Sequence, residues 1–210
     1  MQRRKTVMEE RHPFILGLIG GVGAGKSTVL TLLKNHYGFH VIQTDLAARQ
    51  LLEPGEAAFK EIIALFGPDI LGPDGRIDRA EMAKQMFKDP EKRRQVNDIT
   101  HPLTWRAVLK EAYTCGSRLV VIETALPSKE FRDKCSEMWY LYTSEENRTA
   151  RLMESRGYSP EKSEAIMKSQ ASEAEFRALA DEVIDNNRSQ EYTAGQIKRL
   201  LNGREGIRYT

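Results

Sequence analysis

Residues 20–27 have the types and spacing of a phosphate-binding loop. They read Gly-Gly-Val-Gly-Ala-Gly-Lys-Ser and match the pattern G-x-x-x-x-G-K-S/T at every specified position. Glycine permits backbone conformations that bring peptide N–H groups close to phosphate oxygens, and a helix start adds further free N–H donors. We therefore predict that this segment, called the phosphate loop below, binds a nucleoside triphosphate through Gly21, Gly23, Ala24 and Gly25.

The last residues of the motif supply charge and hydroxyl groups. Lys26 places a positive charge near the β- and γ-phosphates, where it would bind the nucleotide and assist catalysis. The hydroxyl of Ser27 is expected to ligate Mg²⁺, and the hydroxyl of Thr28 can add a further contact. A flexible glycine turn is the alternative, but the motif stands between an expected strand and an expected helix, which favours phosphate binding.

Other classes of nucleotide-binding protein fit the chain less well. The dinucleotide fingerprint G-x-G-x-x-G does not fit, because Val22 and Ala24 occupy the wrong places. The sequence has no N-K-x-D tetrapeptide for reading guanine, and its D-x-x-G at residues 69–72 follows a Phe-Gly-Pro turn rather than an apolar strand. We interpret residues 69–72 as a turn. The class that remains is a small-molecule kinase with a substrate lobe and a mobile lid.

Composition excludes further classes. The chain has 210 residues, of which 40% are hydrophobic and 30% charged, as expected for one globular domain. Its 32 basic and 30 acidic side chains nearly cancel, so its charge gives no reason to expect nucleic acid or an anionic membrane as a partner. Cys115 and Cys135 fit neither a disulfide scaffold nor a metal cluster. We expect a cytoplasmic protein that is monomeric or self-associates only weakly.

Short apolar runs alternate with longer helical patterns, which predicts an α/β fold with a central parallel sheet and helices on both faces. The expected strands are residues 14–19, 39–42, 119–122, 138–142 and 183–184. Asp45 lies just beyond the second run, and Glu123 directly follows the third. Because α/β sheets bind ligands at the carboxyl ends of their strands, both carboxylates are candidate site residues.

Two helical segments interrupt the series of strands. Residues 47–113 are mostly helical in pattern, and residues 147–180 form a second helical stretch rich in Arg, Glu and Lys. We expect one domain over residues 14–205, preceded by an N-terminal extension, residues 1–13. Its parts would be a core (14–45, 114–146 and 181–205), a substrate-binding helical lobe (46–113) and a helical lid (147–180).

The order of motifs along the chain resembles that of the dephospho-CoA kinase family. The similar segments are residues 17–29, 45–49, 53–55 and 74–79, then Asn97 with His101-Pro102, Gln170, Ala180-Asp181 and Ile184-Asp185-Asn186-Asn187. The resemblance implies a P-loop kinase fold with a sheet of about five strands. It also implies transfer of the γ-phosphoryl group of ATP to the ribose 3′-hydroxyl of dephospho-coenzyme A. The products would be coenzyme A and ADP, in the last step of coenzyme A biosynthesis.

Asp45 is the candidate catalytic base. A carboxylate there can accept the proton of an attacking hydroxyl, and the family's corresponding aspartate is the proposed base; capping of the next helix is the alternative. Arg49, four residues on, resembles a family arginine that contacts substrate, with an ordinary surface charge as the alternative. The family usually has D-x-D here, whereas this chain has Gln43-Thr44-Asp45, so the first carboxylate is missing.

Three arginines of the second helical stretch, Arg148, Arg151 and Arg156, are candidates for a role over the nucleotide. Arginines that close over ATP would neutralise charge that grows between phosphates in the transition state, and surface ion pairing is the alternative. We expect at least one to be catalytic and favour Arg151 and Arg156. Glu123 could orient water on Mg²⁺.

Several further residues allow two interpretations. Asn186-Asn187 resembles the family's adenine-proximal turn but fits an ordinary polar turn equally well. His101 is expected to be structural, and Trp105 and Trp139 are expected to be core aromatics. The acceptor also stays open on the residues alone, because a kinase for a nucleoside, nucleotide or polyol, or a nucleotide-dependent switch, would share the phosphate loop.

Overall fold

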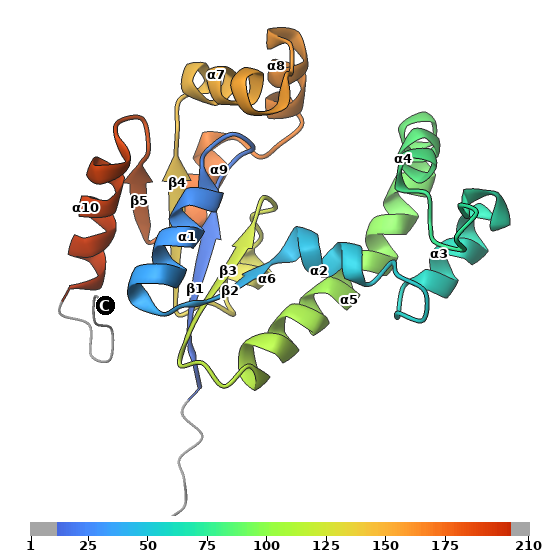
Figure 1. The fold of residues 1–210 in the computed structure, drawn as a ribbon, viewed down its shortest axis with the longest axis horizontal. Helices are drawn as coiled ribbons and strands as arrows, with labels where there is room; N and C mark the ends of the chain where they lie inside the picture. The colour runs from blue at the N-terminus through green and yellow to red at the C-terminus, as the bar shows by residue number, and fades with distance from the viewer. Residues whose placement is uncertain (1–11, 203–210) are drawn as a thin grey trace, which may run out of the picture.

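Five apolar segments pair side by side and form the central sheet (Figure 1). The computed structural model describes residues 12–202, so residues 1–11 of the expected N-terminal extension and residues 203–205 of the expected domain lie outside the described residues. The strands are β1 Phe14–Ile19, β2 His40–Gln43, β3 Leu119–Thr124, β4 Glu137–Tyr142 and β5 Glu182–Asp185. Their order is β2-β3-β1-β4-β5, and every neighbouring pair is parallel, which confirms the predicted sheet.

The register of the sheet brings three strand ends together. Leu18 of β1 is paired with Glu123 of β3, and Gln43 of β2 is paired with the same Glu123. The phosphate loop leaves this edge of the sheet directly after β1. The loop therefore begins beside Glu123 and Gln43, at the edge where α/β sheets bind ligands.

Helices cover both faces of the sheet, as its continuous apolar strands require. On one face lie α1 (Lys26–Tyr37) and α10 (Gln190–Leu201), and on the other lie α5 (Pro90–Thr114), α6 (Lys129–Arg132) and α9 (Glu173–Leu179). None of the helices in residues 12–202 combines the length and the apolar character that crossing a bilayer requires.

The helix α1 follows from the apolar spacing of its residues. It buries Val29, Leu30, Leu33 and Tyr37, which a helical period places on one side. Gly38 ends the helix in the left-handed conformation, with φ 71°, and its N–H donates to the carbonyl of Leu33. This packing fixes the start of α1, and with it the end of the phosphate loop, against the sheet.

The segment between β2 and β3 folds as a helical lobe with an apolar core of its own. It contains α2 (Thr44–Gln50), α3 (Phe59–Phe66), the 3-10 helix η1 (Pro68–Ile70), α4 (Arg79–Lys88) and α5. The helix α5 joins two cores, because Val96 packs in the lobe and Val108 packs under the sheet. Residues 69–72 include the end of η1 and the two residues after it. They do not follow a strand, which agrees with the interpretation of this segment as a turn.

A second helical extension follows β4 and lies above the carboxyl edge of the sheet (Figure 1). It consists of α7 (Glu145–Arg156) and α8 (Pro160–Lys168). The hydroxyl of Ser144 caps α7 by accepting the N–H of Asn147, and Gly157 ends the helix at φ 62°. This extension covers the first part of the segment 147–180 expected to form a lid, whereas α9 packs on the sheet; movement of the extension remains a prediction.

The side chains of Trp139, Trp105 and Cys135 differ in burial. Trp139 in β4 is completely buried, with 0% of its surface exposed, as expected for a core residue. Trp105 in α5 is only half-buried at the margin of the core under the sheet, so the expectation is only partly correct for it. Cys135 is a buried free thiol, and burial raises the pKa of Cys135 to about 12.

Replacing Leu33 by alanine tests the packing of α1 on the sheet. Leu33 is completely buried, at 0% exposed, so Leu33→Ala should lower the free energy of unfolding by about 2–5 kcal/mol. Urea unfolding followed by circular dichroism measures the change. Lys34→Ala, at the exposed neighbouring position, is the control and should shift the same free energy by less than about 0.5 kcal/mol. Equal losses in both variants would contradict the packing described here.

Candidate active site

A cavity of about 550 Å³ opens at the carboxyl ends of β1, β2 and β3. We call it the active-site cavity. Its lining includes residues 21–28, Gln43 and Glu123 at the ends of β2 and β3, Asp45 in α2, and Arg151, Arg156 and Gln170 from α7 and the connection after α8. Two of the candidate residues lie outside the lining of this cavity: Arg49, which is exposed near the end of α2, and Arg148 on α7.

At two positions of the phosphate loop, both the backbone conformation and the lack of space for a side chain require glycine. Gly23 has φ 77° and Gly25 has φ 91°, which lie in the left-handed region that favours glycine. A Cβ atom on Gly25 would lie 2.5 Å from Nδ2 of Asn186, and one on Gly23 would lie 2.9 Å from the carbonyl oxygen of Arg148. Any larger residue would therefore push the loop away from the elements that surround it.

The carbonyl group of Ala24 accepts hydrogen bonds from three donors. They are Thr143 Oγ1 at 3.0 Å, Asn186 Nδ2 at 2.7 Å and Arg151 Nη1 at 3.1 Å. In a trans peptide the N–H points opposite to the C=O, so the N–H of Gly25 is directed away from these donors. The contacts fix the loop with that N–H available to a phosphate group.

Arg148 and Gln170 hold the peptide groups on both sides of Val22. Arg148 Nε donates to the Val22 carbonyl at 2.8 Å, and Arg148 Nη2 donates to Gln170 Oε1 at 2.9 Å. The same Gln170 oxygen accepts the N–H of Val22 at 2.9 Å. Burial lowers the pKa of Arg148, although a guanidinium remains charged in proteins. The second helical extension is therefore fastened directly to the phosphate loop.

Sequence reasoning missed this contact. It favoured Arg151 and Arg156 over Arg148, and it noted Gln170 only as one step in the order of family motifs. Nothing in the spacing of α7 shows which arginine reaches the loop, because the loop lies more than 100 residues earlier in the chain.

Lys26 and Glu123 form an ion pair beneath the loop. Lys26 Nζ lies 3.3 Å from Glu123 Oε1 and donates to the carbonyl of Gly20 at 2.7 Å. Burial lowers the pKa of Lys26, and the carboxylates of Glu123 and Asp45 oppose this shift. The ammonium group is thus kept at the base of the loop, close to the position that phosphates would occupy.

Gln43 stands where the family usually has a first aspartate, and it makes a contact of its own. Its Nε2 donates to Glu123 Oε2 at 3.3 Å. An aspartate at this position would bring a second negative charge towards Glu123, whereas the amide supplies a donor. The substitution therefore lets Glu123 remain paired with Lys26 on one oxygen and with Gln43 on the other.

Asp45 lies in the first turn of α2, where a helix favours negative charge. The N-cap residue of α2 is Gln43, so the alternative in which Asp45 caps the helix is wrong. Asp45 is exposed and lines the active-site cavity. Arg156 lies on the other side of the same cavity, exposed at the end of α7, with its guanidinium 6.0 Å from the ring centroid of Tyr158.

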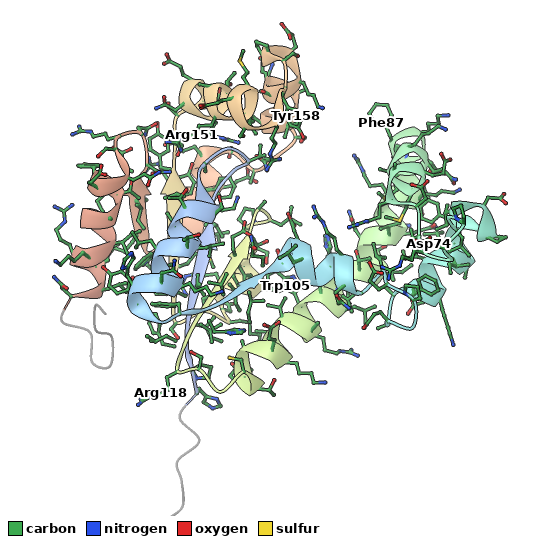
Figure 2. All side chains as sticks on the ribbon, in the orientation of Figure 1. Asp74, Phe87, Trp105, Arg118, Arg151 and Tyr158 are labelled. Atoms are coloured by element: carbon green, nitrogen blue, oxygen red, sulfur yellow. The ribbon has the colours of Figure 1, made fainter. Side chains whose placement is uncertain are left out.

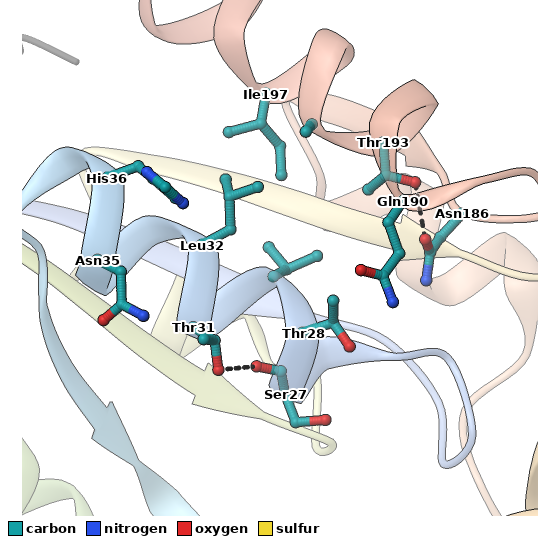
Figure 3. A pocket seen from close by; sticks show the side chains of 12 residues that line it. Ser27, Thr28, Thr31, Leu32, Asn35, His36, Asn186, Gln190, Thr193 and Ile197 are labelled. Atoms are coloured by element: carbon teal, nitrogen blue, oxygen red, sulfur yellow. Dashed lines mark hydrogen bonds between the residues drawn. The ribbon is translucent and has the colours of Figure 1, made fainter. Parts of the chain in front are cut away.

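A neighbouring cavity of about 400 Å³ separates α1 from α10 (Figure 3). Ser27 and Thr28 line both this cavity and the active-site cavity. Asn186 is buried at its edge and accepts a hydrogen bond from Thr193 Oγ1 at 2.7 Å, drawn as a dashed line in Figure 3. Asn186 therefore connects the phosphate loop to the α1–α10 cavity, rather than standing in a solvated turn.

Gly25→Ala should weaken ATP binding at least about 10-fold, since its Cβ meets Asn186 and disturbs the hold on Ala24. Isothermal titration calorimetry with Mg-ATP measures the affinity. Gly38→Ala is the matched control, because Gly38 also has a positive φ, of 71°, but nothing lies within 4 Å of its added Cβ. Both variants should lose stability, and only Gly25→Ala should lose affinity. Unchanged ATP affinity in Gly25→Ala would contradict the assignment of the loop.

Relatives and solved structures agree with this arrangement. The profile of the family described as dephospho-CoA kinase matches residues 14–191. The dephospho-CoA kinase of Carboxydothermus hydrogenoformans is 38% identical over 191 residues, which cover 89% of this chain and 92% of the relative.

Two solved structures share the fold. The crystal structure of a Thermus thermophilus protein has a TM-score of 0.78 and 30% identity, covering 90% of this chain and 97% of its own. Dephospho-CoA kinase from Campylobacter jejuni has a TM-score of 0.66 at 20% identity, with the same coverage of 90% and 97%. With the profile match over most of its length, the chain belongs to the dephospho-CoA kinase family.

Proposed function

We propose that the chain transfers the γ-phosphoryl group of ATP to the ribose 3′-hydroxyl of dephospho-coenzyme A. The reaction gives coenzyme A and ADP, in the last step of coenzyme A biosynthesis. One observation carries the proposal: the phosphate loop, the carboxylate of Asp45 and the guanidinium of Arg156 line one cavity. Membership of the dephospho-CoA kinase family supports the choice of acceptor.

The nucleotide would bind with its phosphates in the phosphate loop and its base towards the α1–α10 cavity. Lys26 now contacts Gly20 and Glu123, and it would turn its ammonium group to the β- and γ-phosphates when they arrive. Because Lys26 is largely buried, solvent and salt screen its charge only weakly. Its interaction with the phosphates is correspondingly strong.

Asp45 would act as the base. As the acceptor oxygen attacks the γ-phosphorus, its proton passes to the Asp45 carboxylate, the bond to the bridging oxygen breaks, and ADP leaves. Most of the rate would come from positioning and from fixed charges. Arg156 is the arginine we propose to neutralise the developing charge, whereas Arg151, held between Ala24 and Asn186, would act through the position of the loop.

Mg²⁺ would accompany the nucleotide. Ser27 and Glu123 line the active-site cavity, and hydroxyl and carboxylate oxygens are suitable ligands for this ion. Within residues 12–202, no three or more His, Cys, Asp or Glu side chains are grouped to hold a metal. The Mg²⁺ ion would therefore be bound mainly by phosphate oxygens and water, with few ligands from the protein. Bound there, Mg²⁺ would neutralise charge on the phosphates.

The setting we propose is the cytoplasm, with the enzyme acting as a monomer. Its substrates would be the small molecules ATP and dephospho-coenzyme A, without a nucleic acid or a membrane as partner. The near balance of 32 basic and 30 acidic side chains gives the chain little net charge, which gives no reason to expect a nucleic acid or an anionic membrane as partner.

An acceptor assay tests the proposal. Purified protein with ATP and Mg²⁺ should release ADP when dephospho-coenzyme A is added, and mass spectrometry should detect coenzyme A. Adenosine, nucleotides, polyols and shikimate serve as competing acceptors, with a reaction lacking acceptor as control. Equal ADP release with and without dephospho-coenzyme A would reject the acceptor, and turnover of another acceptor would identify the alternative kinase.

Asp45→Asn tests the base. The variant should lower kcat by about 10²–10⁴-fold, because general base catalysis contributes that much, and should leave the KM for ATP nearly unchanged. Steady-state kinetics measures both parameters. Asp69→Asn, at an exposed position of η1 outside the cavity, is the matched control and should keep kcat within about twofold. Near-normal turnover by Asp45→Asn would remove this residue from the base role.

A further inference from the structure

A second large cavity lies between α5 and α6, with a volume of about 570 Å³. We call it the α5–α6 cavity. The residues that matter below are His101, Pro102, Trp105 and Leu109 on α5, Phe131 on α6, and Lys134 just after it. The proposed phosphoryl transfer uses none of these residues, although the α5–α6 cavity is as large as the active-site cavity.

The α5–α6 cavity has an aromatic floor and a polar rim. Trp105 stacks on Phe131, with ring centroids 4.7 Å apart and planes at 27°. Phe131 is buried, whereas Trp105 is only half-buried and lines the cavity. His101 and Lys134 are exposed at the rim. A largely apolar surface with a few polar groups at its edge is typical of a small-molecule site.

A short connection joins this cavity to the active site. Ala125 lines the active-site cavity, and Ser128 lines the α5–α6 cavity. Three residues of chain span at most about 11 Å. The hydrogen bond from the Leu126 N–H to Thr124 Oγ1, at 3.1 Å, tightens the start of this connection. The two cavities therefore lie within reach of one extended ligand.

The helix that carries Asp45 packs on α5, which forms one wall of this cavity. Ala47 of α2 and Trp105 of α5 contact the same buried cluster under the sheet. Figure 2 labels Trp105 between the sheet and the helical lobe. A ligand with a hydroxyl group at Asp45 could thus extend along the β3–α6 connection to the face of Trp105.

Dephospho-coenzyme A is a ligand of this shape. From its ribose a diphosphate leads to the pantetheine arm, which combines methyl and methylene groups with two amides and a thiol. The apolar groups suit the face of Trp105, and the amides can hydrogen-bond to His101 or Lys134 at the rim. We propose that the α5–α6 cavity binds the pantetheine arm of the acceptor. This inference rests on the proposed function and names the part of the site that recognises the far end of the substrate.

Such a cavity would let the enzyme select dephospho-coenzyme A over other molecules that carry the same ribose hydroxyl group. ATP and ADP carry the same adenosine 3′-hydroxyl as dephospho-coenzyme A, so the reacting group alone cannot distinguish them. Only dephospho-coenzyme A carries the arm. Binding of the arm beside Trp105 would therefore favour the correct acceptor by affinity rather than by chemistry.

Variants of the cavity test the inference. Trp105→Leu should raise the KM for dephospho-coenzyme A at least about 10-fold, with kcat within about twofold and the KM for ATP unchanged, which is the pattern of lost uniform binding. His101→Ala, at an exposed position, should raise the same KM about threefold. Arg106→Ala, exposed next to Trp105 but outside the cavity lining, is the matched control and should change neither KM.

Three results of these kinetics would overturn the inference. They are an unchanged KM for dephospho-coenzyme A in folded Trp105→Leu, an equal rise in the KM for ATP, or the same change in Arg106→Ala. Circular dichroism shows whether Trp105→Leu folds. If it does not, His101→Ala decides, because this exposed side chain is no part of the core.

Tryptophan fluorescence gives a direct readout without any substitution. The chain has two tryptophans, and Trp139 is completely buried, so iodide quenching reports on Trp105. Dephospho-coenzyme A should protect Trp105 from iodide, whereas adenosine monophosphate, which lacks the arm, should not. Protection by both ligands, or by neither, would overturn the inference.

The two proposals fail in different ways. A wild-type enzyme that does not turn over dephospho-coenzyme A would reject the proposed function. Turnover of dephospho-coenzyme A without protection of Trp105 would reject only the role of the α5–α6 cavity.

Discussion

The structure depends on how the carbonyl groups of the phosphate loop are held. Lys26 binds the carbonyl of Gly20, Arg148 that of Val22, and three donors bind that of Ala24. Since each N–H points opposite to the carbonyl of its own peptide group, the contacts at Val22 and Ala24 direct the N–H groups of Gly23 and Gly25 away from Arg148 and from the three donors. An anion that reaches these N–H groups meets donors that are already oriented, so little further ordering of the loop is needed to bind it.

The sheet supplies the elements that make these contacts. Its order places β1 in the centre, so the loop after β1 is flanked by the strand ends of β3 on one side and of β4 on the other. Glu123 comes from the first side, Thr143 and α7 from the second. The helical lobe begins at β2 and adds Asp45. A single parallel sheet thus brings the phosphate loop and the carboxylate of Asp45 to the same edge.

Much of this arrangement could be predicted from the sequence, because its signals are contiguous segments of the chain. The phosphate loop is a contiguous motif, and the apolar runs that form β1 to β5 are visible as patterns. Asp45 could be found because it follows a strand. The partners of Arg148 and Gln170 could not, because a charged helix offers several arginines at similar spacing and only tertiary packing selects one. Trp105 could not be told from a core aromatic for the same reason: its apolar character is evident, but its exposed face is not.

The burial of Cys135 has a consequence for an enzyme whose substrate and product both carry a thiol. Disulfide exchange requires a thiolate, and burial, which raises the pKa of Cys135 to about 12, keeps this thiol protonated at neutral pH. Cys135 belongs to the same buried cluster as Phe131, the floor of the α5–α6 cavity. A reactive cysteine in this region could form a mixed disulfide with coenzyme A, and the burial of Cys135 disfavours that reaction.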